Sequence, residues 1–396
     1  MTYMKQISER IYYVGVNDHD KLLFEGLWPL PYGVSYNSYL VVDDKVALVD
    51  TVECGFEEEY LEEIRAVLGE RAVDYLVVNH MEPDHSSLIS LICDAYPDVK
   101  IVVNAKTVPM IKGYHGTSQE RLHVVEEGDS LSLGSCSLNF FMVPMVHWPE
   151  TMVTWMPEEK TVFSGDAFGT FGAVAEDPAD GEGTFEQYRD EMIRYYSNIV
   201  GKYGVPVQAA LKKLSGLPVE RICSTHGPVW QACIPEVVAL YDKMSRYEVE
   251  RGVCIVYGSM YGNTAAAADA LAMELEKLGI PYAVHDLACN NAGELGISGA
   301  LRDVFKYDTI AVGSPTYNNG IFPPVEAFMS ALGARLIKDR RFYAFGSYTW
   351  APASVRLLNE KAEAMGFEIL GTGLPFPQAY NREKCDMAAV AALLAQ

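Results

Sequence analysis

Between residues 252 and 396, short apolar segments alternate strictly with segments of helix length, and this alternation limits what the region can fold into. The apolar segments are VCIVYG, YAVHDL, DTIAVGS, RFYAFGS and FEILGT. Strands that are joined through helices lie parallel in one sheet, and their crossovers are right-handed. The pattern therefore predicts an α/β domain with a doubly wound parallel sheet at residues 252–396.

The first part of the chain has a more mixed pattern. It begins with short β-rich segments separated by turns, such as YNSYLVVDD and KVALVDT, and continues with strands that alternate with helices. This order is typical of a sandwich of two sheets with helices outside, an αββα arrangement. A chain of 396 residues is long enough for two cores. We therefore expect one domain at residues 1–248 and a second at residues 252–396.

The charge of the chain limits its partners. It carries 53 acidic and 31 basic residues, a formal net charge of -22. Such a charge repels phosphate backbones and anionic lipids, so it argues against nucleic-acid and membrane partners. The first residues lack the apolar core of a signal peptide, and no apolar run reaches the ~20 residues of a membrane span. We expect a cytoplasmic protein.

The eight cysteines, Cys289 among them, form no C-x-x-C pair, and most stand within apolar segments. This pattern favours buried free thiols over disulfides or a zinc knuckle. The chain is therefore expected to carry no iron–sulfur or rubredoxin-like centre of its own.

The segment VVNHMEPDHSSL, residues 77–88, places two histidines, a glutamate and an aspartate directly after a predicted buried strand. Three further predicted strands end in the same kind of side chain, in MVHW, FSGDAF and STHGP. One such residue after a strand is usually a cap, but seven of them in loops at one edge of a sheet indicate a metal site. The predicted ligands are His80, Glu82, Asp84, His85, His147, Asp166 and His226.

Seven ligands are too many for one tetrahedral ion, and they suit two ions that share a bridging ligand. The pattern resembles the metallo-β-lactamase fold, whose hydrolases carry H-x-H-x-D-H on the corresponding loop. Here Glu82 replaces the second histidine, and its carboxylate makes the ligand shell harder and more anionic. That change favours a redox-active iron pair over zinc.

In the second domain, three predicted strand ends carry loops suited to a flat, phosphorylated cofactor. The loop SMYGNT opens a helix, where hydroxyls and backbone amides bind a phosphate without a cation. The loops in GSPTYNNGIF and GSYTWAPAS combine aromatic rings with small polar residues, which can stack on a flavin ring and bond its edge. Because only one phosphate pocket is evident, FMN is favoured over FAD. The candidate flavin-binding residues are Ser259, Met260, Tyr261, Gly262, Asn263, Thr264, Pro315, Thr316, Tyr317, Asn318, Asn319, Gly320, Ser347, Tyr348, Thr349, Trp350 and Ala351.

Taken together, these motifs resemble the flavodiiron proteins, in which a metallo-β-lactamase-like domain precedes a flavodoxin-like domain. The resemblance covers nearly the whole chain. It implies a non-haem diiron centre and FMN, and the reduction of dioxygen to water, of nitric oxide to nitrous oxide, or of both. It also implies a head-to-tail homodimer, or a tetramer, in which the flavin of one chain serves the irons of the other.

Alternation along the loop at residues 80–85 and the family pattern together predict how the two irons are held. Asp166 bridges the two ions. One iron is held by His80, Glu82 and His147, and the other by Asp84, His85 and His226.

Because no cysteine pair can host a further centre, we expect electrons from a separate donor, either a rubredoxin-like protein or a reduced cofactor. The segment RLIKDRR concentrates four basic residues in the second domain: Arg335, Lys338, Arg340 and Arg341. This segment is either a solvated charged face or a docking patch for an acidic donor.

Two residues depart from the flavodiiron pattern. Glu25 stands where members often have a histidine, and Thr349 stands where many have a glycine that can adopt a special backbone angle. In MIRYYSNIV, Tyr195 or Tyr196 either reaches the iron pocket or packs on a helix face. Two other functions stay open: a zinc hydrolase with an accessory flavodoxin domain, and a redox carrier or sensor with a vestigial metal site.

Overall fold

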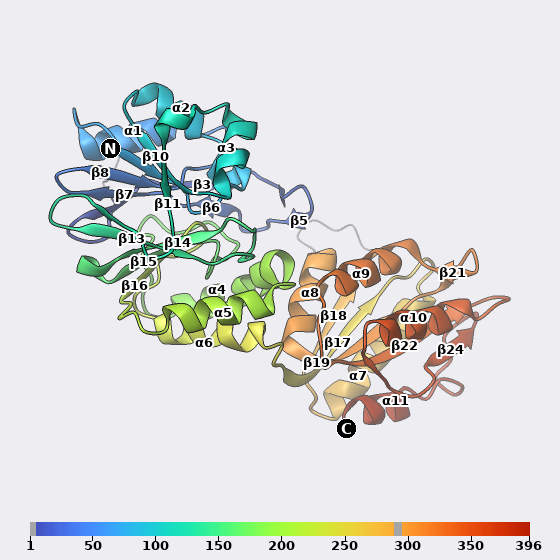
Figure 1. Ribbon diagram of the computed structural model, residues 1–396. Helices are drawn as coiled ribbons and strands as arrows, with labels where there is room; N and C mark the ends of the chain where they lie inside the picture. The colour runs from blue at the N-terminus through green and yellow to red at the C-terminus, as the bar shows by residue number, and fades with distance from the viewer. Residues whose placement is uncertain (1–4, 289–294) are drawn as a thin grey trace. The chain divides into compact units, whose positions relative to one another are not determined.

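The computed structural model describes residues 5–288 and 295–396, and the chain divides into two compact units (Figure 1). The first unit contains Met1–Leu22, Leu30–Tyr195 and Tyr203–Asp242. The second contains Leu23–Pro29, Tyr196–Lys202 and Lys243–Gln396. The domain limits expected from the sequence, 1–248 and 252–396, stay a prediction.

The first unit is a sandwich of two sheets. The larger sheet has the strand order β1 (Lys5–Gln6), β2 (Ile11–Tyr13), β7 (Tyr39–Val42), β8 (Val46–Val49), β9 (Tyr75–Val77), β10 (Lys100–Asn104) and β11 (Leu122–Val125). The smaller has the order β12 (Ser130–Ser132), β13 (Ser137–Met142), β14 (Met152–Met156), β15 (Thr161–Gly165) and β16 (Arg221–Ser224). Apolar side chains of both sheets form one core, in which Val77 and Val102 share a cluster with Phe140 and Phe163. The predicted sheet sandwich is confirmed.

Helices cover the outer faces of this sandwich (Figure 1). Those beside the larger sheet are α1 (Glu57–Leu68), α2 (Ile89–Ala95) and α3 (Thr107–His115). Those beside the smaller sheet are α4 (Thr184–Tyr195), α5 (Gly204–Leu214) and α6 (Ile234–Ser245). Strands β8 to β11 run parallel, and β15 and β16 also pair in parallel. Parallel strands end at the same edge, so the loops that follow them meet there.

The second unit is built on a parallel sheet with the order β18 (Tyr282–Asp286), β17 (Glu250–Tyr257), β19 (Tyr307–Gly313), β22 (Arg341–Tyr348) and β23 (Glu368–Ile369). A further strand, β24 (Leu374–Pro377), also pairs in parallel with β22. Its helices are α7 (Asn263–Lys277), α8 (Gly296–Lys306), α9 (Pro323–Ala334), α10 (Ala353–Ala364) and α11 (Met387–Leu394). The order, in which the first strand lies between the second and the third, confirms the predicted doubly wound sheet.

The last strand of this sheet differs from the expectation. The segment FEILGT was expected to form one strand, but after Glu368–Ile369 the parallel pairing with β22 is interrupted, and β24 resumes it further along the same strand. Gly373 lies at the end of this interruption with a φ of +82°, and a Cβ there would stand 2.6 Å from the carbonyl oxygen of Ala344. The backbone approaches β22 too closely for any side chain, so the strand is interrupted at the glycine.

The seven described cysteines are free thiols, as the sequence predicted, but only four of them are buried, because Cys54 is exposed and Cys93 and Cys233 are half-buried. Cys289 lies outside the described residues. Within residues 5–288 and 295–396, no helix has both the length and the apolar character needed to cross a bilayer.

Candidate metal centre and cofactor loops

The loop that follows β9 is held at its start by Asn79. The backbone N–H of Asn79 donates to Asp50 Oδ1 at 2.8 Å, and its side-chain amide donates to Asp50 Oδ2 at 3.1 Å. Thr154 on β14 donates to Asn79 Oδ1 at 2.7 Å. The loop is thereby fixed to both sheets before it delivers its histidines and carboxylates. Sequence reasoning did not identify Asp50 or Asn79.

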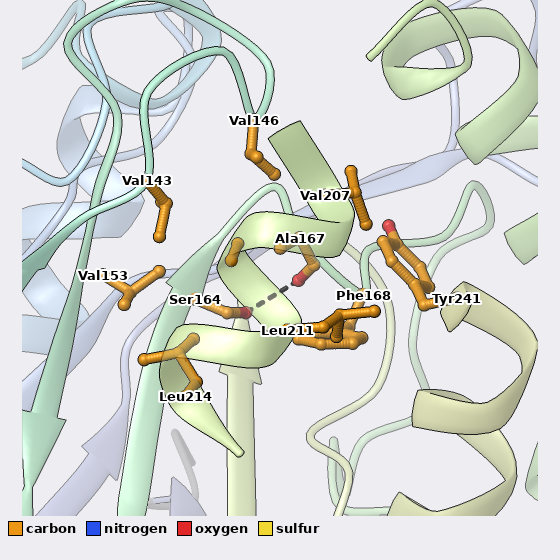
Figure 2. Close-up of a pocket in the computed structure, with 11 residues that line it drawn as sticks. Val143, Val146, Val153, Ser164, Ala167, Phe168, Val207, Leu211, Leu214 and Tyr241 are labelled. Atoms are coloured by element: carbon orange, nitrogen blue, oxygen red, sulfur yellow. Dashed lines mark hydrogen bonds between the residues drawn. The ribbon is translucent and has the colours of Figure 1, made fainter. Parts of the chain in front are cut away.

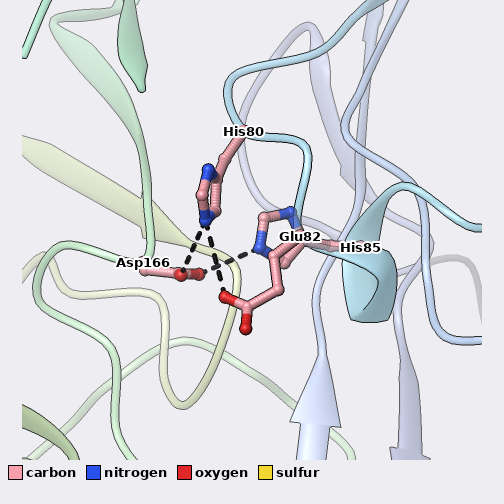
Figure 3. Close-up of side chains that lie close together, drawn as sticks. All are labelled: His80, Glu82, His85 and Asp166. Carbon is pink, nitrogen blue, oxygen red and sulfur yellow. Dashed lines mark ion pairs between the residues drawn. The ribbon is translucent and has the colours of Figure 1, made fainter. Parts of the chain in front are cut away.

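The seven predicted ligands converge in the first unit, and all are buried. We call them the histidine–carboxylate cluster; four of them are drawn in Figure 3. The Oδ2 atom of Asp166 lies 2.9 Å from His147 Nε2 and 3.7 Å from His80 Nε2. Glu82 Oε2 lies 2.9 Å from His147 Nε2 and 3.5 Å from His80 Nε2. One group therefore contains two imidazoles and a carboxylate beside one oxygen of Asp166.

The other oxygen of Asp166 faces a second group of the same composition. Its Oδ1 atom lies 3.1 Å from His85 Nε2 and 3.6 Å from His226 Nε2. Asp84 Oδ2 lies 3.2 Å from His226 Nε2, and Asp84 Oδ1 lies 3.7 Å from His85 Nε2. A carboxylate whose two oxygens face two ligand groups is placed to bridge two ions. A ligand atom of His85 also lies within 4.8 Å of ligand atoms of His80, Glu82 and Asp166, so the assignment of each ligand to one of two ions stays a prediction.

Further contacts orient the ligands from outside the cluster. His80 Nδ1 lies 2.8 Å from Glu150 Oε1, and His226 Nδ1 donates to the carbonyl oxygen of Ser35 at 2.7 Å. Because a carbonyl can only accept, this bond puts the proton of His226 on Nδ1 and leaves the lone pair of Nε2 facing the cluster. The hydroxyl of Thr225 donates to Asp166 Oδ1 at 2.5 Å. Glu150 was not among the predicted residues, although it follows His147 by only three residues.

The electrostatics of the cluster favour cations. Burial alone would lower the pKa of His85, but the carboxylates of Asp166 and Asp84 outweigh it and raise that pKa to about 10. Burial would raise the pKa of Asp166, but the neighbouring histidines hold it well below its usual value. His80 Nε2 and Asp84 Oδ1 are buried and have no hydrogen-bond partner among the described residues. Buried polar atoms are rarely left without a partner, so the cluster fits bound metal ions.

The donor set also indicates which metal it suits. The ligand atoms of His80, Glu82, His85 and Asp166 lie within 4.8 Å of one another. Each group offers two histidines and one carboxylate besides the shared Asp166, and no sulfur. Two histidines and a carboxylate on one face are typical of non-haem iron.

One of the two tyrosines considered from the sequence lies at the cluster. The ring of Tyr195, at the end of α4, stands 5.5 Å from the ring of His226 and 5.1 Å from that of Phe171. Tyr196 belongs to the second unit, where its ring packs 5.8 Å from Phe305. Glu25 is also part of the second unit, and its carboxylate accepts a hydrogen bond from Trp28 Nε1 at 2.9 Å.

In the second unit, the first cofactor loop, residues 259–264, is held in a turn by its own residues. The N–H of Gly262 donates to Ser259 Oγ at 3.1 Å, and Gly262 has a φ of +84°. Helix α7 begins at the next residue, Asn263, so its first amides and the positive end of its dipole face the loop. Thr264 Oγ1 lies 3.1 Å from Ser347 Oγ, which connects this loop to the third one.

The second loop, residues 315–320, is a tight hairpin of β20 (Thr316–Tyr317) and β21 (Gly320–Ile321). Asn318 and Asn319 at its turn have φ values of 48° and 57°, as a type I′ turn requires. The hydroxyl of Thr316 accepts from the N–H groups of Ala353 and Ser354, each at 3.2 Å. These bonds fix the start of α10 against the second loop.

The third loop, residues 347–351, begins with the last two residues of β22 and continues beyond it. Thr349 does not have a positive φ, so its backbone carries none of the strain considered from the sequence. Trp350 is 81% exposed, and Tyr261 of the first loop is 88% exposed. All the candidate flavin-binding residues lie in the three loops, which follow the neighbouring parallel strands β17, β19 and β22. Their roles stay predictions.

At Arg340, the basic segment RLIKDRR forms neither a docking patch nor a solvated face. Arg340 is only 1% exposed, and its guanidinium donates to the carbonyl oxygens of Val304, Tyr247 and Lys338. Arg335 likewise donates to the carbonyl of Ser197. Both interpretations drawn from the sequence were therefore wrong for Arg340, because its buried guanidinium donates hydrogen bonds to backbone carbonyls of the second unit.

Comparisons with known proteins agree with this arrangement. The profile of the ODP family of beta lactamases matches residues 34–227, and the flavodoxin profile matches residues 255–389. An uncharacterised protein of Methanocaldococcus jannaschii is 32% identical, over 92% of this chain and 91% of its own length. The anaerobic nitric oxide reductase flavorubredoxin of Aeromonas hydrophila is 31% identical, over 92% of this chain and 73% of its own length.

Solved structures extend the likeness to the whole chain. The rubredoxin oxygen:oxidoreductase of Desulfovibrio gigas is 28% identical, with a TM-score of 0.90 over 99% of this chain and 97% of its own. The flavodiiron protein of Giardia intestinalis is 26% identical, with a TM-score of 0.91 over 100% of this chain and 95% of its own. On the two matched domains and these full-length likenesses, the chain belongs to the flavodiiron protein family.

Proposed function

We propose that the chain reduces dioxygen to water, nitric oxide to nitrous oxide, or both, at two iron ions that receive electrons through FMN. The observation that carries this proposal is the position of Asp166, whose two oxygens each face two histidines and a carboxylate. The names of its relatives, a nitric oxide reductase flavorubredoxin and a rubredoxin oxygen:oxidoreductase, support it.

In the proposed site, His80, Glu82 and His147 hold one iron, and Asp84, His85 and His226 hold the other. When bound, the irons supply reducing electrons and open coordination positions for the gas. The chain's own residues orient the ligands. Glu150 fixes the ring of His80, the Ser35 carbonyl fixes that of His226, and Thr225 holds the carboxylate of Asp166. Held in this way, the ligands need little rearrangement when metal binds.

The three loops of the second unit are the proposed FMN site. The turn at residues 259–264 and the start of α7 supply hydroxyls and amides for one phosphate. The exposed rings of Tyr317 and Trp350 are available to flank the flavin ring. A single phosphate cradle favours FMN over FAD.

We extend the proposal to assembly and electron supply. The reduction of one dioxygen takes four electrons and four protons, so the chain needs a donor outside itself, a rubredoxin-like protein or a reduced cofactor. A head-to-tail homodimer, or a tetramer, would bring the flavin of one chain to the irons of another. The domain limits at residues 248 and 252 and a cytoplasmic location also stay predictions.

Two measurements test the central proposal. Metal analysis and acid extraction of the purified protein should give two irons and one FMN per chain, whereas zinc at both positions would favour a hydrolase. Anaerobic stopped-flow mixing of the reduced protein with each gas should show rapid oxidation by at least one of them. A reduced, iron-loaded protein that reacts with neither gas would contradict the proposal, and a fully active monomer in analytical ultracentrifugation would contradict the dimer.

A further inference from the structure

The first unit contains a small cavity of about 20 Å³ between helix α5 and the loops that carry part of the histidine–carboxylate cluster (Figure 2). Helix α5 contributes four side chains along one face, and α6 contributes Tyr241. The remaining wall comes from the segments around β13, β14 and β15. The lining residues are Val143, Val146, Val153, Ser164, Ala167, Phe168, Val207, Ala210, Leu211, Leu214 and Tyr241.

Three of the lining residues are chain neighbours of the proposed iron ligands. Val146 directly precedes His147, and Ala167 and Phe168 directly follow Asp166. Successive Cα atoms are about 3.8 Å apart, so the wall of the cavity and the cluster are formed by the same two loops.

The lining has few groups that can form hydrogen bonds with water. None of its eleven residues is charged, and the hydroxyls of Ser164 and Tyr241 are the side-chain polar groups among them. The hydroxyl of Ser164 donates to the carbonyl of Ala167 at 2.7 Å, as Figure 2 shows, so its proton is already used within the wall. A buried water needs two to four polar partners, and cavities without them stay dry and take up apolar molecules such as xenon.

The size of the cavity limits its occupant. A volume of about 20 Å³ exceeds the ~10–15 Å³ that one water-sized molecule requires. It leaves room for a single diatomic molecule. Dioxygen and nitric oxide are small, uncharged and weakly hydrated, so both gain by leaving water for an apolar space.

We propose that this cavity is a binding site for the gaseous substrate, which waits there beside the metal centre before reaction. The identity of the gas rests on the proposed function. The binding of an apolar diatomic molecule rests on the lining of the cavity alone. Dioxygen and nitric oxide are both small and uncharged, so the lining does not distinguish between them. Kinetic assays with each gas show which of the two uses the cavity.

Xenon is the probe for binding, because its uptake does not depend on activity. Val207 on α5 lines the cavity and is 2% exposed, whereas Val205 on the same helix is 76% exposed. Val207→Ile adds one methylene to the cavity, and Val205→Ile adds the same group to the surface. In xenon-pressurised crystals of the iron- and flavin-containing protein, xenon should occupy the cavity in the wild type and in Val205→Ile. In Val207→Ile its occupancy should fall about tenfold. Water or empty space in the wild-type cavity under xenon would overturn the proposal.

The same pair of variants tests whether the cavity serves the reaction. Val207→Ile should raise KM for the gas several-fold and leave kcat at saturating gas unchanged, and Val205→Ile should change neither. Separate assays with dioxygen and nitric oxide show which gas uses the site. If xenon binds but both KM values stay unchanged, the cavity holds gas without supplying the centre, and that part of the proposal fails. If the protein consumes neither gas, the proposed function fails while the xenon result still decides whether the cavity binds apolar gas. Should Val207→Ile melt well below the wild type, Ala210→Val fills the cavity from the same helix face.

Discussion

The two candidate sites of this chain are prepared for their cofactors in different ways. In the first unit the ligand side chains are buried and fixed, with His80 held by Glu150 and Asp166 held by Thr225. In the second unit the backbone of the loops is fixed, by Gly262 and by the bonds to Thr316, while aromatic rings such as that of Trp350 stay exposed. One site is ordered through its side chains and the other through its backbone.

The difference follows from what each cofactor needs. A metal ion demands donor atoms within a few tenths of an ångström of fixed positions, and buried carboxylates without a cation are costly. A flavin is bound over a large flat area, so aromatic rings can adjust to it once the turn that holds its phosphate is formed. Changes to side chains should therefore be most severe in the first unit, and changes to backbone conformation should matter most in the second.

The largest effect is expected from Asp166→Ala. The variant removes the carboxylate whose two oxygens face both ligand groups, so both iron positions should be lost and gas consumption should fall by at least about 100-fold. Iron per chain by elemental analysis and gas uptake by electrode measure the two losses. Retention of two irons per chain would show that Asp166 is not the bridge, and FMN content should stay unchanged as an internal control.

A smaller loss is expected from Glu150→Gln, which keeps the shape of the side chain but removes the charge beside His80 Nδ1. Metal affinity at the His80 position should fall about tenfold, as measured by competition with a chelator. Glu127→Gln is the matched control, because Glu127 is an exposed carboxylate that pairs with Lys213 at 2.9 Å. Equal metal affinity in the two variants would mean that Glu150 does not tune the cluster.

In the second unit, Gly262→Ala tests the role of backbone conformation. Its φ of +84° is strained for alanine by about 1–2 kcal/mol, although the added Cβ would meet no atom within 4 Å. We expect FMN to bind about tenfold more weakly, as measured by fluorescence titration. Gly279→Ala imposes a similar strain, at a φ of +67°, beyond the other end of α7. That control should lower the melting temperature to a similar degree and leave FMN affinity unchanged, and a parallel loss of affinity in both would point to general destabilisation.

The smallest effect is expected from Trp350→Ala. Because the ring is largely exposed, its removal should change the free energy of unfolding by less than about 0.5 kcal/mol. Loss of stacking should weaken FMN binding by about 1 kcal/mol, or about fivefold. Tyr114→Ala removes an exposed ring from α3 of the first unit and should leave the flavin unaffected. An unchanged FMN dissociation constant in Trp350→Ala would exclude this ring from the site.

Patterns within single segments were enough to predict much of this molecule. The alternation at residues 252–396 predicted the parallel sheet, and four strand ends predicted the seven residues that the structure brings together. Both predictions worked because strands that run in the same direction, paired or not, place their following loops at one edge.

What the sequence did not predict depends on contacts between distant segments. Glu150 reaches His80 across 70 positions, and Ser35 reaches His226 across 191. Arg340 was misjudged because the carbonyls that bury it belong to other segments, including those of Val304 and Tyr247. The interrupted last strand likewise depends on how closely Gly373 approaches Ala344. A pattern within one segment does not predict contacts with residues that are far away in the sequence.

The two outer contacts of the metal cluster differ in how they can be altered. Glu150 orients His80 through a side chain, which a single codon change can shorten, neutralise or remove. His226 is oriented by a backbone carbonyl, that of Ser35 in β6 (Val34–Tyr36), which every amino acid at this position would retain. Substitutions of Glu150, natural or engineered, can therefore change the orientation of His80 by small amounts. The half of the centre around His226 can be changed only by moving a strand or replacing the ligand itself.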